Sequence, residues 1–416
     1  MSELELALRQ PAQIGDRARS DFVLGTQNHL PGTVVRGAFA AAWIAARGAP
    51  APGSPDRRLF LRLFEGGIRF GPLFGGAEFI PLSVVSHKYR PGEHCQVIEY
   101  DRALQDDVPD RCAECESPLE HPKGVRGNPI RVRRRTSVAI ASSGVARRGL
   151  LVSRDTLEAG QSFRGTLVAD EPVLLETLSG LGPVRVGGRR TTHGSADVRI
   201  HDGMPPPTAG RRDDGCLILR LRSPGIFVDS HGRPRRDPDP DELQDVLGCP
   251  ARVVRRWARW ENAGGWHLAS GLPKPVELAV APGSTYVVET DGEVTDDALA
   301  ALGRRGLGLR RHEGFGDLAP PPVLAPGRLS READNRRRRT LVDAVAPLRG
   351  LAVSRPKSWE LLMGKLAAHA AGDESATEFL RVMAGQLDQR TAGALRLYLG
   401  LSHEDASYVA GELSQQ

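Results

Sequence analysis

Two loops rich in glycine and arginine constrain the fold of this chain more than any other feature. The first reads Gly188-Arg-Arg-Thr-Thr-His-Gly194, and the second, about 120 residues later, reads Gly308-Leu-Arg-Arg-His-Glu-Gly314. In both loops two glycines stand six residues apart, adjacent arginines lie between them, and a predicted helix comes before. A helix–loop–strand signature that occurs twice predicts two duplicated α/β domains.

The second loop carries further glycines, since Gly306 precedes it and Phe315-Gly316 follows it. When the two loops are aligned on their glycines, Ala196 of the first stands where the second has Gly316. A side chain at that position predicts that the first loop wraps a phosphate less well than the second.

The composition of these loops predicts a contact with phosphate groups. Glycine allows positive φ angles and has no Cβ, so successive backbone N–H groups can turn toward one anion. Arginine adds charge and two-pronged hydrogen bonds to phosphate oxygens. The alternative is an ordinary glycine turn that packs a helix against a sheet. The loops follow helices and precede strands, an order that argues against dinucleotide-binding and P-loop motifs.

Stretches rich in proline, glycine and charge separate the predicted domains. Residues 202–215 and 319–339 have the composition of linkers. Residues 87–130 contain Cys, His, Asp, Glu and Pro with little periodicity, and we interpret them as an insertion. The sequence therefore predicts a first domain, a second domain and a C-terminal helical region, at residues 1–201, 216–318 and 340–416.

Local patterns predict individual elements. Leucines alternate with polar residues over positions 4–8, which predicts a strand. Thr33 can cap a helix that runs to about Arg47, where Gly48 ends it. The acidic, proline-broken stretch 237–242 is typical of a solvated loop.

The positive charge of the chain is carried mainly by arginine. The net charge is +5, and arginines cluster in pairs and triplets. Clustered guanidinium groups suit nucleic acid, because they bind phosphates and stack on bases. The alternative for any single pair is a solvated cation with no partner.

The remaining composition predicts a cytoplasmic protein that does not contact a membrane. The N-terminus, MSELELALRQ, lacks the basic and apolar regions of a signal peptide. The longest apolar run, Ala38–Ala46, is shorter than the about 20 residues that span a bilayer. Five cysteines, an odd and low number for this length, favour a reducing compartment over a disulfide framework.

Several short motifs follow one another in a specific order over about residues 1–318. They are Leu30–Ala38, Pro81-Leu82-Ser83 ahead of Lys88, Cys112-x-x-Cys115 ahead of Pro118-Leu119, Arg135–Ile140, Arg147-Arg148-Gly149, Val186–Arg190 and Gly306–Gly316. This order resembles that of the RAMP superfamily of CRISPR-associated proteins. Within that superfamily, the chain is similar to the large two-domain RAMP subunit of type III-D effector complexes.

This resemblance implies an α+β fold with two ferredoxin-like, RRM-related βαββαβ domains, a Cys/His insertion and a helical C-terminal region. The implied role is a non-catalytic scaffold in antiviral defence that holds the repeat-derived 5′ tag of a CRISPR RNA and caps the complex. Implied partners are other RAMP backbone subunits, the large polymerase-like subunit and, indirectly, target RNA. The residues expected to bind RNA are Arg36, Lys88, Arg133, Arg134, Arg135, Arg147, Arg148, Gly187, Gly188, Arg189, Arg190, Gly306, Gly308, Arg310, Arg311, Gly314, Phe315 and Gly316.

A cysteine and histidine cluster in the insertion predicts a structural zinc ion. Cys112 and Cys115 form a Cys-x-x-Cys knuckle, which supplies two of the four ligands of tetrahedral zinc. Cys95 is the third candidate because thiolate is a soft ligand, and His87 stands before Lys88 where the resembling family tends to have cysteine. The alternative is reduced surface cysteines beside scattered histidines.

Two other functions remain open from the sequence. Related RAMP proteins process repeat RNA without metal, with a histidine as general base. His29, just ahead of the first predicted helix, is the candidate for that role, and His193 and His312 in the glycine loops are others. The second alternative is a zinc-stabilised protein-interaction module with incidental basic charge.

Overall fold

The computed structural model describes most of the chain as two compact units of mixed α and β structure. Most of residues 1–327 belong to the larger unit, and the smaller one contains the C-terminal helices. The described residues are 1–20, 23–89, 95, 99–122, 124–128, 130–189, 191–206, 209–267, 271–319, 341–342, 344–351, 356–401 and 403–414.

An antiparallel sheet forms the centre of the first half of the larger unit. Its strands lie in the order β14-β15-β1-β13-β5-β4. Their bounds are Val184–Arg185, Ser195–Asp202, Ser2–Leu8, Ser162–Ala169, Ile68–Phe74 and His29–Leu30. Leu4, Leu6 and Leu8 are buried, as the alternation along β1 predicts.

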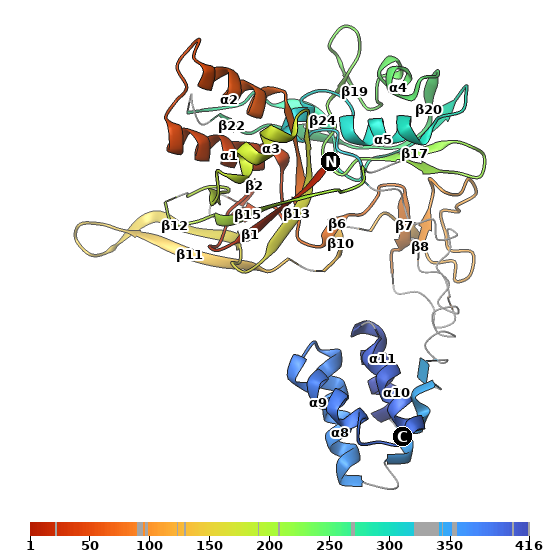
Figure 1. Cartoon of the computed structure of the whole chain (residues 1–416). Coiled ribbons are helices and arrows are strands. Elements are labelled where there is room, and N and C mark those ends of the chain that lie inside the picture. The colour runs from red at the N-terminus through yellow and green to blue at the C-terminus, as the bar shows by residue number, and fades with distance from the viewer. Residues whose placement is uncertain are drawn as a thin grey trace. The chain divides into compact units, whose positions relative to one another are not determined.

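Three helices pack against this sheet (Figure 1). They are α1 (Gly32–Arg47), α2 (Pro55–Glu65) and α3 (Pro172–Ser179). Phe39 and Trp43 of α1 are buried in the same core as the β1 leucines. The predicted cap of α1 is wrong, because Pro31 is the N-cap residue and no side chain caps this helix.

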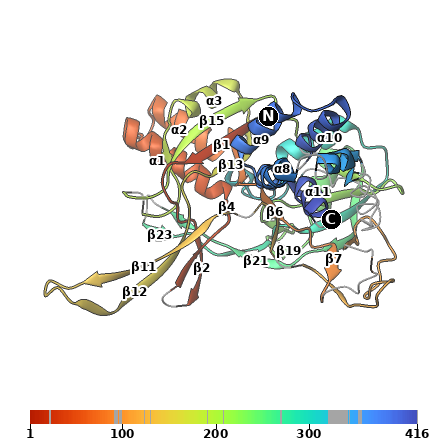
Figure 2. The same cartoon turned by 90° about the horizontal axis from the view of Figure 1, so that it is seen from below.

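A long hairpin extends from the first half (Figure 2). It consists of β11 (Val132–Ile140) and β12 (Ala146–Leu157), and continues into β3 (Val23–Thr26) and β2 (Gly15–Ser20). Nearly every residue of β11 is exposed. The hairpin therefore presents both of its faces, and only its base, at Leu157, enters the core.

A second sheet, in the order β16-β17-β25-β20, forms the other half of the larger unit. Its strands are Gly210–Arg211, Leu217–Arg220, Thr285–Thr290 and Ala251–Trp257. Two helices, α4 (Pro240–Leu247) and α5 (Asp296–Arg305), pack in the same core as this sheet. Among the described residues, the strand expected after the second glycine loop is reduced to one bridge between Leu221 and Leu318.

Short strands connect these elements. Those in the insertion or just ahead of it are β6 (Ala77–Phe79), β7 (Val84–His87), β8 (Glu99–Asp101), β9 (Leu119–Glu120) and β10 (Val125–Gly127). Those of the second half are β18 (Phe227–Val228), β19 (Pro234–Arg235), β21 (Trp260–Ala263), β22 (Trp266–His267), β23 (Leu272–Pro273) and β24 (Glu277–Val280). The 3-10 turn η1 (Arg311–Glu313) lies within the second glycine loop.

The smaller unit has a helical core of its own. Its elements are η2 (Ala346–Arg349), α8 (Pro356–Ala370), α9 (Glu374–Ala384), α10 (Gln389–Leu399) and α11 (His403–Ser414). Leu366, Leu380 and Tyr398 are buried together in this core. The Tyr398 hydroxyl lies 3.0 Å from the carbonyl oxygens of both Leu366 and Ala406, and its one proton is donated to these acceptors.

Candidate nucleic-acid interface

The two glycine loops have the same backbone hydrogen bonds. In each loop, two N–H groups donate to carbonyls in the segment that follows one strand, β1 in the first half and β17 in the second. These bonds of 2.8 to 2.9 Å join Gly188 to Gln13 and Gly194 to Pro11 in the first loop, and Leu309 to Ile226 and Gly316 to Pro224 in the second. Arg189 and Arg310 occupy equivalent positions, and both have a φ of 55°. Since φ is rarely positive outside glycine, this shared feature identifies one repeated loop structure.

The equivalent glycines differ from those that the sequence alignment matched. Gly194 corresponds to Gly316, because a Cβ on either would lie within 2.0 Å of a carbonyl oxygen, that of Val186 or Leu307. Ala196 corresponds to Leu318, since Ala196 pairs with Leu8 at the end of β1 and Leu318 forms a bridge with Leu221, just after β17. The alignment of Ala196 with Gly316 was therefore wrong: the second loop is one residue longer. A glycine is present in both loops where the backbone requires it.

The second loop already holds a carboxylate of the protein. The backbone N–H of Gly308 donates to both oxygens of Glu242, at 2.9 and 3.2 Å. The Arg311 guanidinium pairs with the same carboxylate at 3.1 Å. Glu242 therefore occupies the place that the sequence assigned to a phosphate.

Glu242 reaches this place because the acidic stretch is not the solvated loop that the sequence predicts. Asp239 accepts a hydrogen bond from the N–H of Asp241 and caps α4. Glu242 lies in the first turn of this helix, where the helix dipole favours a negative charge. Only 14% of its side chain is exposed.

Arg310 also has internal partners. Its guanidinium pairs with Glu277 and with Glu313, and lies 4.7 Å from the centre of the Phe315 ring. Burial raises the pKa of Glu313, but hydrogen bonds from Arg310 and Lys274 outweigh this and, with the charge of Arg36, lower it to about 2. The arginines of the second loop are thus neutralised by carboxylates of the protein itself.

Glycines of the second loop make close backbone contacts. A Cβ on Gly314 would lie 2.3 Å from the carbonyl oxygen of Phe70 and 2.9 Å from Cα of Gly32. A Cβ on Gly306 would lie 2.8 Å from the Gly316 carbonyl oxygen. These glycines allow the loop to pack on the first half, and their binding of RNA stays a prediction.

The first loop, in contrast, is open to solvent. Gly188 and Arg189 are exposed, and the Arg189 side chain has no hydrogen bond or ion pair with any residue that the structure describes. Burial lowers the pKa of the nearby His193, and the charges of Arg189 and Arg135 lower it further. Arg135 of the hairpin therefore lies near the first loop. Arg190 lies outside the described residues.

One face of the hairpin adds cations to this region. Arg135 of β11 and Arg154 of β12 are directly opposite one another, so their side chains share a face. Arg133 lies on the same face, two residues from Arg135. Like charges directly opposite one another destabilise a sheet, and no carboxylate of the described chain pairs with these three. Sequence reasoning missed Arg154, because only the strand register shows that it opposes Arg135.

The other face of the hairpin is neutralised. Arg134 makes a two-pronged ion pair with Asp155, at 2.7 and 3.0 Å. Thr136 and Ser153 form a hydrogen bond beside it, at 2.7 Å. Arg134 thus differs from Arg133 and Arg135, although the sequence grouped the three.

The remaining predicted RNA-binding residues are dispersed. Arg36 is largely buried and pairs with Glu65 at 3.0 Å and Glu313 at 3.4 Å. Lys88 pairs with Glu120 at 3.4 Å. Arg147 is exposed on β12, and Arg148 also belongs to this strand. Their contact with RNA stays a prediction.

His29 is poorly placed for acid–base chemistry. Its ring is stacked on Phe74, with centroids 5.3 Å apart, and contacts Phe79 edge-on at 5.2 Å. Only 8% of the residue is exposed. Burial, with the charge of Arg222, lowers its pKa to about 4, so the ring is neutral and weakly basic.

The predicted metal ligands are brought together. The ligand atoms of His87, Cys95, Cys112 and Cys115 all lie within 4.8 Å of one another, so this cluster could bind a metal. The thiols of Cys95 and Cys112 are 3.6 Å apart. Two sulfurs bound to one tetrahedral zinc at 2.3 Å stand about 3.8 Å apart, so this separation fits zinc.

The local backbone explains how the knuckle forms. The N–H of Cys112 donates to Ser117 and the N–H of Glu116 donates back to Cys112, both at 2.9 Å. Glu116 has a φ of 54°, which turns the chain sharply after Cys115. His87 ends β7, which pairs with β9. His121 instead lies 3.1 Å, through Nδ1, from the carbonyl oxygen of Val84, and His94 lies outside the described residues.

Comparison with known sequences finds a family match over part of the chain. Residues 169–319 match the family described as CRISPR-associated protein (Cas_Cmr3). The matched segment contains both glycine loops and runs from the end of β13 to the bridge at Leu318. None of the curated proteins matches the chain.

Several solved structures are similar to this chain at low identity. A chain of the Type III-B Cmr-beta complex bound to cognate target RNA is 12% identical, with a TM-score of 0.42 over 76% of this chain and 96% of that one. A chain of the Csm3-Csm4 subcomplex of the type III-A CRISPR-Cas interference complex is 12% identical, with a TM-score of 0.34 over 71% and 96%. The CRISPR associated protein Cas6 is 10% identical, with a TM-score of 0.31 over 77% and 99%. TM-scores this low do not establish a common fold.

In the part of the chain that the structure describes, no helix has the length and apolar character needed to cross a membrane.

Proposed function

We propose that this protein is a non-catalytic, RNA-binding scaffold subunit of a type III CRISPR effector complex. It would hold the repeat-derived 5′ tag of a CRISPR RNA and cap the complex, in contact with RAMP backbone subunits and a large polymerase-like subunit. Target RNA would be contacted only indirectly. Two ferredoxin-like domains would carry the RNA, with the family match over residues 169–319 as support.

The observation that carries this proposal is a set of cations with no acidic partner among the described residues. Arg133, Arg135 and Arg154 share one exposed hairpin face, and Arg189 lies near it on the first glycine loop. Most other arginines of the larger unit are paired, as Arg134 and Arg310 are. Unpaired cations that repel one another cost stability, which a bound polyanion offsets.

The environment of His29 favours a scaffold over a ribonuclease. A general base must reach the hydroxyl that it deprotonates, and works best with a pKa near the working pH. His29 is buried between two phenylalanines and has a pKa of about 4. We therefore expect intact repeat RNA after incubation with the purified protein in chelator. Specific cleavage that His29→Ala abolishes would overturn this expectation.

The expected ion in the Cys/His cluster is zinc, with His87, Cys95, Cys112 and Cys115 as ligands. Its role would be structural, since four protein ligands leave no open position for a substrate. A zinc ion would link His87 to the three cysteines and so stabilise the fold of the insertion. If the protein binds zinc but does not bind RNA, it is a zinc-stabilised protein-interaction module instead.

The decisive experiment compares two sets of substitutions in the full chain. In Arg135→Gln/Arg154→Gln/Arg189→Gln, we expect the affinity for short single-stranded RNA to fall by roughly tenfold or more at low salt. The slope of log affinity against log salt should become less steep by about one for each phosphate that the variant no longer binds. Fluorescence anisotropy with labelled RNA measures both quantities.

Arg134→Gln is the matched control, because it removes an arginine from the opposite face of the same hairpin. It should leave the affinity for RNA within about twofold of the wild type. An equal fall in affinity in the control and the triple variant would show that general charge, and not this face, binds RNA. Unchanged binding in the triple variant would reject the proposed interface.

The zinc prediction is tested by metal analysis and by removal. The purified protein should contain about one zinc ion per chain. Cys112→Ser should abolish that content and lower the midpoint of thermal unfolding, whereas Cys249→Ser, which changes a cysteine outside the cluster, should do neither. Metal-free protein of unchanged stability would contradict a structural zinc.

A further inference from the structure

A cleft of about 670 Å³ lies between the two halves of the larger unit. One wall comes from the first half, at the segment 26–33 with Pro72 and Phe79, and the other from the second half, at β21. Gly314 and Phe315 of the second glycine loop also line it. The cleft is within the size range of sites that hold a nucleotide-sized ligand.

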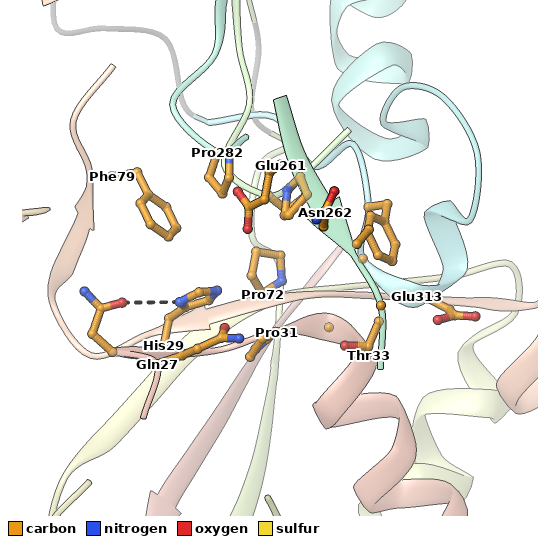
Figure 3. A pocket seen from close by; sticks show the side chains of 18 of the residues that line it. Gln27, His29, Pro31, Thr33, Pro72, Phe79, Glu261, Asn262, Pro282 and Glu313 are labelled. Carbon is orange, nitrogen blue, oxygen red and sulfur yellow. Dashed lines mark hydrogen bonds between the residues drawn. The ribbon is translucent and has the colours of Figure 1, made fainter. Parts of the chain in front are cut away.

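The apolar groups of the cleft are flat. Trp260 and Phe79 line it together with four prolines, at positions 31, 72, 224 and 282. In Figure 3, Pro31 and Pro72 lie between His29 on one side and Asn262 on the other. Arg236 lies 5.3 Å from the centre of the Trp260 ring, and 36% of Trp260 remains exposed. Flat apolar walls of this kind suit the face of a ring.

The polar groups of the cleft include several that the protein leaves unused. The side chains of Thr33, Arg259 and Asn262 line the cleft and make no hydrogen bond or ion pair with any residue that the structure describes. The amide of Asn262 offers a donor and an acceptor side by side, which matches the edge of a nucleobase. Arg259 offers a cation that suits a phosphate or a base edge.

His29 does not add charge to this cleft. Its ring is held by Phe74 and Phe79, and its Nδ1 lies 3.3 Å from the side-chain oxygen of Asn28, as the dashed line in Figure 3 shows. Because burial keeps the ring neutral, it extends the flat wall rather than binding an anion. The cleft therefore combines planar walls with amide and guanidinium groups, and the carboxylates of Glu261 and Glu313 also line it.

From this combination, and on the basis of the proposed RNA-binding function, we propose that the cleft takes one unpaired nucleobase of the bound single-stranded RNA. The base lies against Trp260 and the prolines. Asn262 bonds the edge of the base and Arg259 its phosphate or sugar edge. The cations of the hairpin and first glycine loop then bind the backbone, while the cleft selects the nucleotide.

Photochemical cross-linking of RNA bases to the full chain tests this assignment. The probe is a pool of short single-stranded RNAs of random sequence in which 4-thiouridine replaces uridine. Because the photoactive group is on the base, cross-linked peptides identified by mass spectrometry show where bases lie. We expect cross-links at Trp260, Phe79 and Phe315.

Two variants distinguish a base in the cleft from a base nearby. Asn262→Ala changes an exposed side chain that makes no hydrogen bond or ion pair with any described residue, and Trp260→Ala removes a stacking surface. Each should lower the yield at Phe79 and Phe315 by about fivefold or more, the decrease expected for one stacking or base-edge contact. Trp266→Ala is the control, since this tryptophan is 62% exposed and does not line the cleft.

The outcomes separate this inference from the proposed function. If RNA binds and cross-links form only outside the cleft, the inference fails and the scaffold function stands. If the cleft cross-links persist in both Asn262→Ala and Trp260→Ala, these residues do not hold a base and the inference fails. If the chain retains no RNA in the anisotropy experiment, both proposals fail together.

Discussion

The two glycine loops share a backbone but differ in the charges around them. Arg189 and Arg310 have the same φ, and Gly194 and Gly316 donate equivalent hydrogen bonds. Yet the second loop is neutralised by Glu242, Glu277 and Glu313, whereas no carboxylate of the described residues pairs with Arg189. The two sequence motifs therefore share one loop backbone. Whether such a loop is open to a phosphate of RNA depends on whether a carboxylate of the protein already neutralises it.

We expect the largest effect from substitution of the equivalent glycines that the two loops share. Alanine at Gly194 or Gly316 places a Cβ within 2.0 Å of a carbonyl oxygen at a positive φ, so each should lose roughly 3 kcal/mol or more of unfolding free energy. Gly188→Ala is the control, because its nearest neighbour is 4.0 Å away. Urea unfolding measures all three. A large loss at only one of the paired glycines would mean that the loops are not equivalent.

We expect the next largest effect from removal of the Glu242 carboxylate, which distinguishes the second loop from the first. Glu242→Ala leaves the Gly308 N–H and Arg311 without their partner, and should cost about 1–3 kcal/mol. Added phosphate should restore part of this stability, because it can enter the emptied site. Asp241→Ala, from the same helical turn, should show neither effect in thermal unfolding with and without phosphate. Equal behaviour of the two variants would show that Glu242 does not fill an anion site.

We expect a smaller effect from substitution of the equivalent arginines, Arg189 and Arg310. Arg189→Gln should change stability by less than about 0.5 kcal/mol, because the side chain is exposed and unpaired among the described residues. It should weaken RNA binding by severalfold. Arg310→Gln should lower the stability and leave RNA binding unchanged. It breaks the ion pairs with Glu277 and Glu313 but removes no cation from the open surface. Loss of RNA binding in Arg310→Gln alone would reverse our assignment of the two loops.

A further effect is a pH dependence in the acid range, which we expect from Glu313 of the second loop. Glu313 has an ordinary pKa of 4.5 in the unfolded chain and about 2 when folded. A depressed pKa contributes stability that is fully present above 4.5 and is lost as the pH falls toward 2. The difference in unfolding free energy between wild type and Glu313→Gln should therefore shrink over this range. A difference that does not vary with pH would show that Glu313 is not held ionised by its neighbours.

The sequence predicted features that depend on local pattern. The alternation of leucines over positions 4–8 correctly predicted the strand β1, and the four metal ligands that the sequence proposed lie together in the structure. It could not predict Glu242, because proline and aspartate are common both in solvated loops and at helix starts. It also missed the Arg135 and Arg154 pair, since register is a property of two strands and not of either one.

Chemical modification of arginines tests most directly the claim that RNA binds the open loop and not the neutralised one. Phenylglyoxal reacts with accessible guanidinium groups, and mass spectrometry locates the modified residues in the unaltered chain. We predict that Arg135 and Arg189 react in the free protein and are protected by single-stranded RNA, and that Arg310 reacts slowly with or without RNA. Protection of Arg310 by RNA, with Arg189 reacting equally in both states, would contradict the account.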